Sequence, residues 1–409
     1  MDVYSLWPGL ACLGLVIALA ATPAFRAIDP PGEASVGTGR LATLDGLRGL
    51  LALGVFFAHA SVYHLFLLDG RWWTPSVAYG LLGQGGVSLF FMVTGFLFWS
   101  RLIREGGRPD WVALYVVRLF RIGPVYYIAI GGMLLGTAVE TGFQLVVDLP
   151  TLALELLAWS AMGVSAAPVN GFGAWLLLAG VTWSLRYEWF FYASLLPLSW
   201  FARAPGRHLP CAMILVCGSA GLAVLEPAPG TGLPRESVCA LLFSLGMLTA
   251  SLQATGYAAG TIWRLSDGVA SLVIVAVLGV FPEAFPDAYN VAPALALGVV
   301  FHLIAGGCSM FGLLRTRPLR RLGDISYGIY LLQGLALAVV MRPAPLRAVA
   351  LSSPAGHWAM VAAACVLLVV MAAVVHVVVE RPGIRLGRRV VRDWLRRTSP
   401  RRISPAAPT

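Results

Sequence analysis

The chain has 409 residues, of which 58% are hydrophobic and 12% are charged, and its mean hydropathy is +0.80. This composition excludes a soluble domain, because apolar runs of about 20 residues recur along the whole length. It predicts an all-α polytopic membrane protein that binds the lipid bilayer directly. The net charge of +10 comes from arginine alone. Since the arginines cluster at the ends of apolar runs, the positive-inside rule and anionic lipid headgroups explain them, and we expect no nucleic-acid partner.

Eleven apolar runs are predicted to be transmembrane helices. They cover residues 6–25, 43–67, 82–101, 122–140, 175–201, 210–225, 238–257, 269–281, 291–314, 325–341 and 358–379. The shorter run 149–164 carries Glu155 in its middle, and we expect it to lie in the interface or to re-enter. Counting it as a span would separate Arg203 and Arg207 from the other arginines. The positive-inside rule therefore favours eleven spans, with the N-terminus outside and the C-terminus in the cytoplasm.

The two ends of the chain differ from the apolar middle. Residues 18–20 fit a signal-peptide cleavage site, but no basic residue precedes the first apolar run, which favours an uncleaved anchor. We therefore divide the chain into a transmembrane anchor with a cytoplasmic linker (1–40), a main membrane domain (41–382) and a basic tail (383–409). The tail is rich in arginine and proline, and we predict that it is disordered in the cytoplasm.

The stretch 44–60 places Asp45 and Arg48 at the head of an apolar run and His59 deep inside it. On a helix, Arg48 and His59 are about three turns and roughly 16 Å apart and project from nearly the same face. Ionisable groups are costly within a bilayer, so this stripe predicts a path for a long ligand with a polar head. The structural alternatives are contact of Arg48 with lipid phosphates and an interhelical hydrogen bond of His59.

Two later segments carry further charges. Arg118 and Arg121 are three residues apart and share a helix face, which predicts a phosphate clamp or, alternatively, ordinary positive-inside charge. Arg186 and Glu188 lie near the middle of the predicted span 175–201. Being two residues apart on a helix, they do not face each other, so we expect each to find its partner elsewhere.

Six segments, in order, resemble motifs of the acyltransferase 3 family of integral-membrane acyltransferases. They are LDGLRG with the histidine at 44–59, the small-residue helix 85–102, R-x-x-R-I-x-P-x-Y at 118–126, TWSL-x-x-E at 182–188, LGDISY at 322–327 and E-x-P at 380–382. Thr94 stands where a serine is usual in the family. Gln333 stands where a histidine is usual, and because glutamine cannot act as a base, this places a second catalytic histidine in doubt.

The resemblance implies a ten-helix acyltransferase core with one additional N-terminal helix. It implies transfer of an acyl group, often acetyl, from acetyl-CoA or another acyl-CoA to a hydroxyl of a carbohydrate or glycosylated small molecule, at a bacterial inner or plasma membrane and without a metal. His59 would be the general base, and Glu188 would orient His59 or the acceptor. Arg48, Arg118 and Arg121 would hold the nucleotide phosphates. The further candidates are Asp45, Ser184, Arg186, Tyr330 and Gln333.

A transporter or exporter of a sugar, a lipid-linked sugar or a similar small molecule is the competing class. In that case Arg186, Glu188 and His59 would form a substrate or proton path. The sequence has neither the inverted repeat nor the paired interrupted helices that are common in secondary transporters. A non-catalytic assembly or receptor protein would leave the stripe of Arg48 and His59 unexplained.

Overall fold

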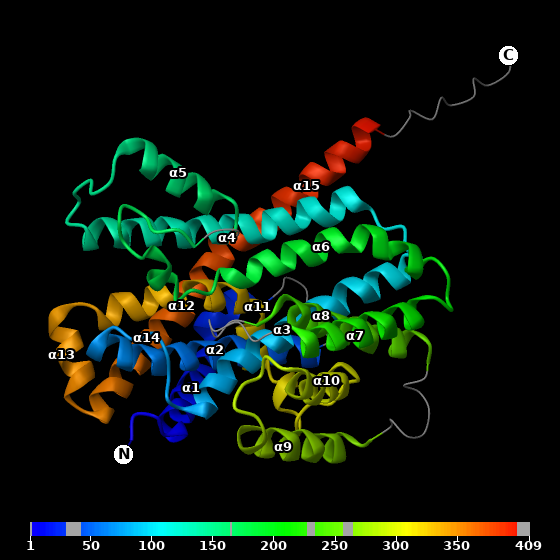
Figure 1. Cartoon of the computed structure of the whole chain (residues 1–409), viewed down its shortest axis with the longest axis horizontal. Helices are drawn as coiled ribbons and strands as arrows, with labels where there is room; N and C mark the ends of the chain where they lie inside the picture. Colours follow the sequence, from blue (N-terminus) through cyan, green and yellow to red (C-terminus); the bar gives the residue numbers. More distant parts are fainter. Residues whose placement is uncertain (1, 30–41, 164–165, 227–233, 257–264, 399–409) are drawn as a thin grey trace.

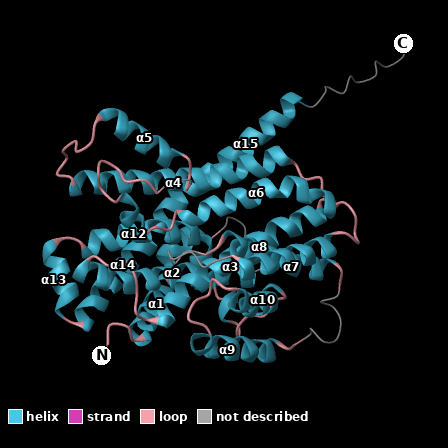
Figure 2. Cartoon of the chain, in the orientation of Figure 1, coloured by secondary structure: helices cyan, strands magenta, loops and turns pink. Residues whose placement is uncertain are grey.

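The computed structural model describes residues 2–29, 42–163, 166–226, 234–256 and 265–398, and these residues form helices and connecting loops without a β-strand (Figures 1 and 2). The α-helices are α1 Leu6–Ala21, α2 Ala42–Asp69, α3 Val77–Arg104, α4 Trp111–Glu140, α5 Leu149–Ser160, α6 Trp183–Ala202, α7 His208–Leu225, α8 Glu236–Ala254, α9 Asp267–Ala284, α10 Val291–Ala305, α11 Arg317–Asp324, α12 Ser326–Met341, α13 Ala344–Ser352, α14 Pro354–Val375 and α15 Arg381–Thr398. The predicted all-α polytopic membrane fold is confirmed.

Seven helical stretches of the described chain are long and apolar enough to cross a membrane. They are α2, α3, α4, α7, α8, α9 and the continuous stretch Pro354–Arg396. The pair α11 and α12, bent by 71°, would make an eighth span. Helices α1, α5 and α10 are apolar but shorter. The chain is thus a multi-pass membrane protein, while the count of eleven spans stays a prediction.

The predicted span 175–201 is interrupted rather than continuous. It consists of a 3₁₀ turn at Ala174–Leu178, a left-handed break at Ala179 and Gly180 with φ of 53° and 68°, and then α6. Helix α12 presses against this break, since a β-carbon at Gly334 would overlap the backbone of Leu178 and Ala179. Irregular backbone at membrane depth is tolerated where protein covers it. The break therefore lies beside the stretch of α12 that holds Gln333.

Helix α2 lies in the middle of the molecule, packed against α3, α11 and α12 (Figure 1). Its first turns touch α11 backbone to backbone. A β-carbon at Gly49 would overlap the carbonyl of Leu319, and one at Gly323 would overlap the carbonyl of Asp45. The glycines of the LDGLRG and LGD segments therefore let the two helices meet without a side chain between them, as small residues do in membrane helix pairs. This contact fixes the position of Arg48.

The prediction that the tail is disordered is wrong for part of it, because residues 381–398 form helix α15. Gly383 and Gly387, one turn apart, lie against Phe120 of α4, and this packing explains why the segment is ordered. Residues 399–409 of the tail and residues 30–40 of the predicted linker lie outside the described residues.

Candidate active site

A cavity between α2, α3, α4, α6 and α12 collects most of the predicted site residues. Its polar lining is Arg48, Thr94, Arg118, Arg121, Ser184, Glu188, Ser326, Tyr327 and Tyr330. The remaining lining is apolar, largely phenylalanine, leucine and valine from α3. Charged groups in an apolar cavity are costly unless they are paired. Their partners therefore show which of them are already occupied and which remain available to a ligand.

Arg118 is held on several sides. Its Nη2 donates to Oε2 of Glu188 at 2.9 Å, and the hydroxyl of Tyr192 donates to the same oxygen at 2.5 Å. The guanidinium carbon also lies 5.5 Å from the ring centre of Phe98 and 5.1 Å from that of Tyr192. The expectation that Glu188 pairs with another helix is confirmed. Ion pair and cation–π contacts together make Arg118 a fixed part of the cavity wall.

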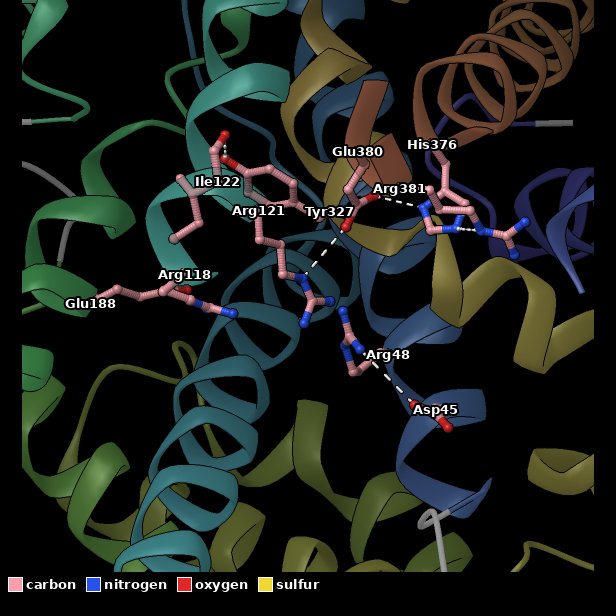
Figure 3. A network of polar contacts seen from close by, with 10 residues as sticks. All are labelled: Asp45, Arg48, Arg118, Arg121, Ile122, Glu188, Tyr327, His376, Glu380 and Arg381. Carbon is pink, nitrogen blue, oxygen red and sulfur yellow. Dashed lines mark hydrogen bonds and ion pairs between the residues drawn. The ribbon is translucent and has the colours of Figure 1, made fainter. Parts of the chain in front are cut away.

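Arg121 and Arg48 are held less tightly (Figure 3). Nε of Arg121 lies 3.4 Å from Oε1 of Glu380, and Nη1 of Arg48 lies 4.0 Å from Oδ1 of Asp45. Asp45 lies near Arg48 but is not among the residues that line the cavity. Glu380 is a residue that the sequence interpretation did not assign to the site, although the E-x-P match marked its position.

Ser184 of α6 and Tyr330 of α12 meet in the lining of the cavity. The hydroxyl oxygens of Ser184 and Tyr330 are 2.9 Å apart, and the Tyr330 hydroxyl is 3.1 Å from the carbonyl oxygen of Val181. If Tyr330 donates to that carbonyl, its oxygen can accept the proton of Ser184. Ser184 and Glu188 are one turn apart on α6, so both face the cavity. The structure thus brings two of the further candidates to the same wall as Glu188.

His59 lies outside the cavity lining, beside α12. Its Nδ1 is 3.2 Å from Oε1 of Gln333, and Nε2 of Gln333 donates to the carbonyl of Tyr330 at 2.8 Å. Because the amide nitrogen is used on Tyr330, the amide oxygen faces His59, which places the ring proton on Nδ1 and leaves the lone pair on Nε2. Gln333, not Glu188, therefore orients His59.

The predicted path from Arg48 to His59 stays a prediction, because the cavity that contains Arg48 does not include His59 in its lining. Arg48 lines the cavity, whereas His59 is part of a different environment, reached along α12 from Tyr330 to Gln333. There, its ring centre is 6.2 Å from that of Trp72, which in turn is 5.6 Å from that of Trp175. Trp72 lies in the loop between α2 and α3, where no motif marked it.

Arg186 is turned away from the cavity. Its Nη2 donates to the hydroxyl of the next residue, Tyr187, at 2.9 Å, and its guanidinium carbon is 4.9 Å from the Tyr187 ring centre. Arg186 therefore does not pair with Glu188, as expected, and its partner is the neighbouring residue on its own helix. The reason is geometric, because residues two apart on a helix point in nearly opposite directions and Glu188 faces the cavity.

Comparison with known proteins identifies the family of the chain. The profile of the acyltransferase 3 family, described as an acyltransferase domain, matches residues 41–377. The exopolysaccharide production protein ExoZ of Rhizobium meliloti (strain 1021) is 30% identical over 75% of this chain and 91% of its own length. The acyltransferase MdmB of Streptomyces mycarofaciens is 27% identical over 86% of this chain and 93% of its own length.

Nodulation protein 10 of Rhizobium leguminosarum bv. viciae is 27% identical over 89% of this chain and 98% of its own length. No solved structure matches the chain. The family profile covers more than half of the chain, and its span contains every cavity residue that the motifs marked. The chain therefore belongs to the acyltransferase 3 family, and it is a membrane acyltransferase.

Proposed function

We propose that this acyltransferase moves an acyl group, in the simplest case acetyl, from acyl-CoA to a hydroxyl of a carbohydrate or glycosylated acceptor. The observation that carries the proposal is the cavity in which three arginines from α2 and α4 converge. Guanidinium forks suit phosphate groups, and coenzyme A carries phosphates at the end opposite its thioester. The name of one relative, an exopolysaccharide production protein, supports a carbohydrate acceptor.

In the proposed complex, Arg48, Arg118 and Arg121 hold the donor phosphates, and the pantetheine arm extends toward Tyr330. The cavity's apolar wall from α3 suits the uncharged part of this arm. The thioester reaches the region between Tyr330 and His59. The partly exposed rings of Trp72 and Trp175 lie on the other side of His59 and offer apolar faces to an acceptor.

His59 is the proposed general base. Its Nε2 takes the proton of the acceptor hydroxyl while the oxygen attacks the thioester carbonyl carbon, forming a tetrahedral intermediate. When this collapses, the carbon–sulfur bond breaks, and the proton passes from His59 to the leaving sulfur, giving the ester and free coenzyme A. Base catalysis of this kind contributes about 10²–10⁴-fold to the rate. A histidine suits the step because its ordinary pKa is about 6.5.

The test of this function is donor consumption by the purified protein. With acetyl-CoA labelled in the acetyl group, release of free coenzyme A and transfer of label to a carbohydrate acceptor are expected. A transporter would leave the thioester intact and would instead move a solute across vesicle membranes. Intact acetyl-CoA in the presence of acceptor extracts from the source cells would contradict the proposal.

The proposed orientation puts the N-terminus outside and the C-terminus in the cytoplasm of the inner or plasma membrane. Arg104 and Arg320 are then cytoplasmic, and Glu236 is on the opposite side, as the positive-inside rule requires. Single cysteines at these three positions, in a chain without its native cysteines, are expected to react with a membrane-impermeant reagent from opposite sides. Labelling of positions 104 and 236 from the same side would overturn this orientation.

A further inference from the structure

The junction of α14 and α15 contains a π-helical turn, His376–Glu380. The backbone N–H of Arg381 donates to the carbonyl of His376, five residues earlier. Pro382 explains this turn, because proline has no N–H to donate and its ring crowds the carbonyl four residues before it. Such turns are rare and occur often at functional sites. Here the turn carries the glutamate of the E-x-P segment, to which the proposed reaction gives no role.

The carboxylate of Glu380 is buried, with the residue 1% exposed, and its two oxygens have different partners. Oε2 accepts from Nδ1 of His376 at 2.7 Å, and Oε1 faces Nε of Arg121 at 3.4 Å. On the far side of the ring, Nε of Arg381 donates to Nε2 of His376 at 3.0 Å. Since arginine only donates, Nε2 accepts and the proton of Nδ1 goes to Glu380. The carboxylate of Glu380 is therefore held in place by His376, which is itself held by Arg381.

The position of Glu380 determines which nitrogens of Arg121 are used in their contact. Arg121 uses Nε in this contact, so its two terminal nitrogens are left for other partners. Figure 3 shows the ends of the Arg121 and Arg48 guanidinium groups pointing toward each other, and both residues line the cavity. Two adjacent cations repel, and a buried carboxylate beside them offsets this repulsion. Arg118, by contrast, has its own carboxylate in Glu188.

We propose that Glu380 is a positioning residue for phosphate recognition. Held by His376 and Arg381, it fixes Arg121 beside Arg48, and the facing forks of these two arginines bind the phosphate groups of the acyl donor. This inference rests on the proposed function, and it narrows the phosphate site from three arginines to two. It also gives the E-x-P segment a role, because the proline creates the turn that delivers the carboxylate.

The experiment compares two donors that differ in phosphate content. Acetyl-CoA carries the phosphates, and S-acetylpantetheine has the same thioester without them. Glu380→Gln is expected to raise KM for acetyl-CoA about tenfold, the scale of one charge-assisted hydrogen bond, while kcat and the KM for S-acetylpantetheine stay within about twofold. Glu380→Asp keeps the charge and is expected to recover part of the acetyl-CoA affinity. Glu105→Gln, an exposed carboxylate paired with Arg101, is the matched control.

Equal losses with both donors would mean that Glu380 only supports the fold, and an unchanged KM for acetyl-CoA would mean that it does not position Arg121. Either result overturns the inference. If S-acetylpantetheine turns over too slowly, equilibrium binding of coenzyme A and of pantetheine to the same variants gives the same contrast. Failure of the proposed function is distinguishable, because the unmodified protein would then transfer acetyl from neither donor.

Discussion

The arginine cavity and the surroundings of His59 adjoin each other along α12, yet their polar groups have different kinds of partner. The partners are charged in the cavity and neutral around His59. In the cavity, each arginine has a carboxylate nearby, at distances from 2.9 to 4.0 Å. Around His59, the neighbours are the neutral amide of Gln333 and the aromatic ring of Trp72. A site with paired charges suits a phosphate, because a phosphate can replace the carboxylate as the partner of an arginine or bind the same arginine beside it. A neutral site suits a base, which must hold its lone pair free.

Tyr330 belongs to both regions, since its hydroxyl faces the cavity and its carbonyl anchors Gln333. The two halves of the proposed reaction, holding the donor and removing a proton, therefore rest on different residues. Substitutions in one region are expected to leave the other function intact.

The largest effect is expected for His59→Gln. Glutamine keeps a hydrogen-bonding side chain but accepts no proton at neutral pH, so acyl transfer is expected to fall by about 10²-fold or more. Coenzyme A affinity is expected to stay within about twofold, because the arginines are untouched. Steady-state kinetics and equilibrium binding on the same preparation measure both. Retention of most activity would make the ring structural and move the search for the base to Glu188, the carboxylate that lines the cavity.

Within the cavity, Arg118→Ala and Arg121→Ala are expected to differ, although the two residues share a helix face. Loss of Arg118 leaves the carboxylate of Glu188 without its ion pair, which is expected to cost about 1–3 kcal/mol of stability. The unfolding temperature in detergent is the measurement. Adding Glu188→Gln to the same chain removes the unpaired charge and is expected to recover part of the loss. An unchanged unfolding temperature would contradict the fixed role of Arg118.

Arg121→Ala is expected to act on the donor instead. It removes one fork from the proposed phosphate site, so KM for acetyl-CoA is expected to rise about tenfold with little change in unfolding temperature. Arg104→Ala removes the same charge from the exposed end of α3 and serves as the control. A donor KM that rises equally in both variants would indicate general attraction by positive charge and not a phosphate site.

The contrast between Arg118 and Arg121 also shows how far the sequence could lead. The resemblance to the family predicted the convergence of Arg48, Arg118 and Arg121, but it assigned Glu188 to His59 or the acceptor. It could not predict the pairing. Neighbouring positions on α4 contact α6 in one case and the α14–α15 junction in the other, and this depends on how the helices cross.

The sequence did not mark the aromatic residues near His59, and the reason is different. Trp72 lies in a loop, and Trp175 lies in a 3₁₀ turn ahead of a left-handed break, so neither belongs to a periodic apolar pattern. The apolar run 175–201 predicted one continuous helix, because composition alone does not register a change of backbone direction. Apolar patterning therefore marks apolar segments, but it does not show where the backbone within such a segment changes direction.

The smallest effect is expected at Gln333, where a single neutral hydrogen bond is at stake. Its amide is fully buried and joins the carbonyl of Tyr330 to Nδ1 of His59. In Gln333→Ala the ring loses this acceptor and can turn, so Nε2 is presented to the acceptor hydroxyl only part of the time. One such bond contributes about 0.5–1.5 kcal/mol, which corresponds to a fall in kcat of about 3–10-fold with an unchanged donor KM.

Gln333→His is the sharper variant, because an imidazole is the side chain that usually occupies this position in the family. A ring nitrogen can accept from Nδ1 of His59 as the amide oxygen does, so kcat is expected to stay within about threefold of the unmodified enzyme. Steady-state kinetics with acetyl-CoA for both variants decide the matter. If Gln333→Ala is as active as the unmodified enzyme, His59 is held by its helix and the neighbouring rings alone. If Gln333→His is as impaired as the alanine variant, the amide has a role that a ring nitrogen cannot fill.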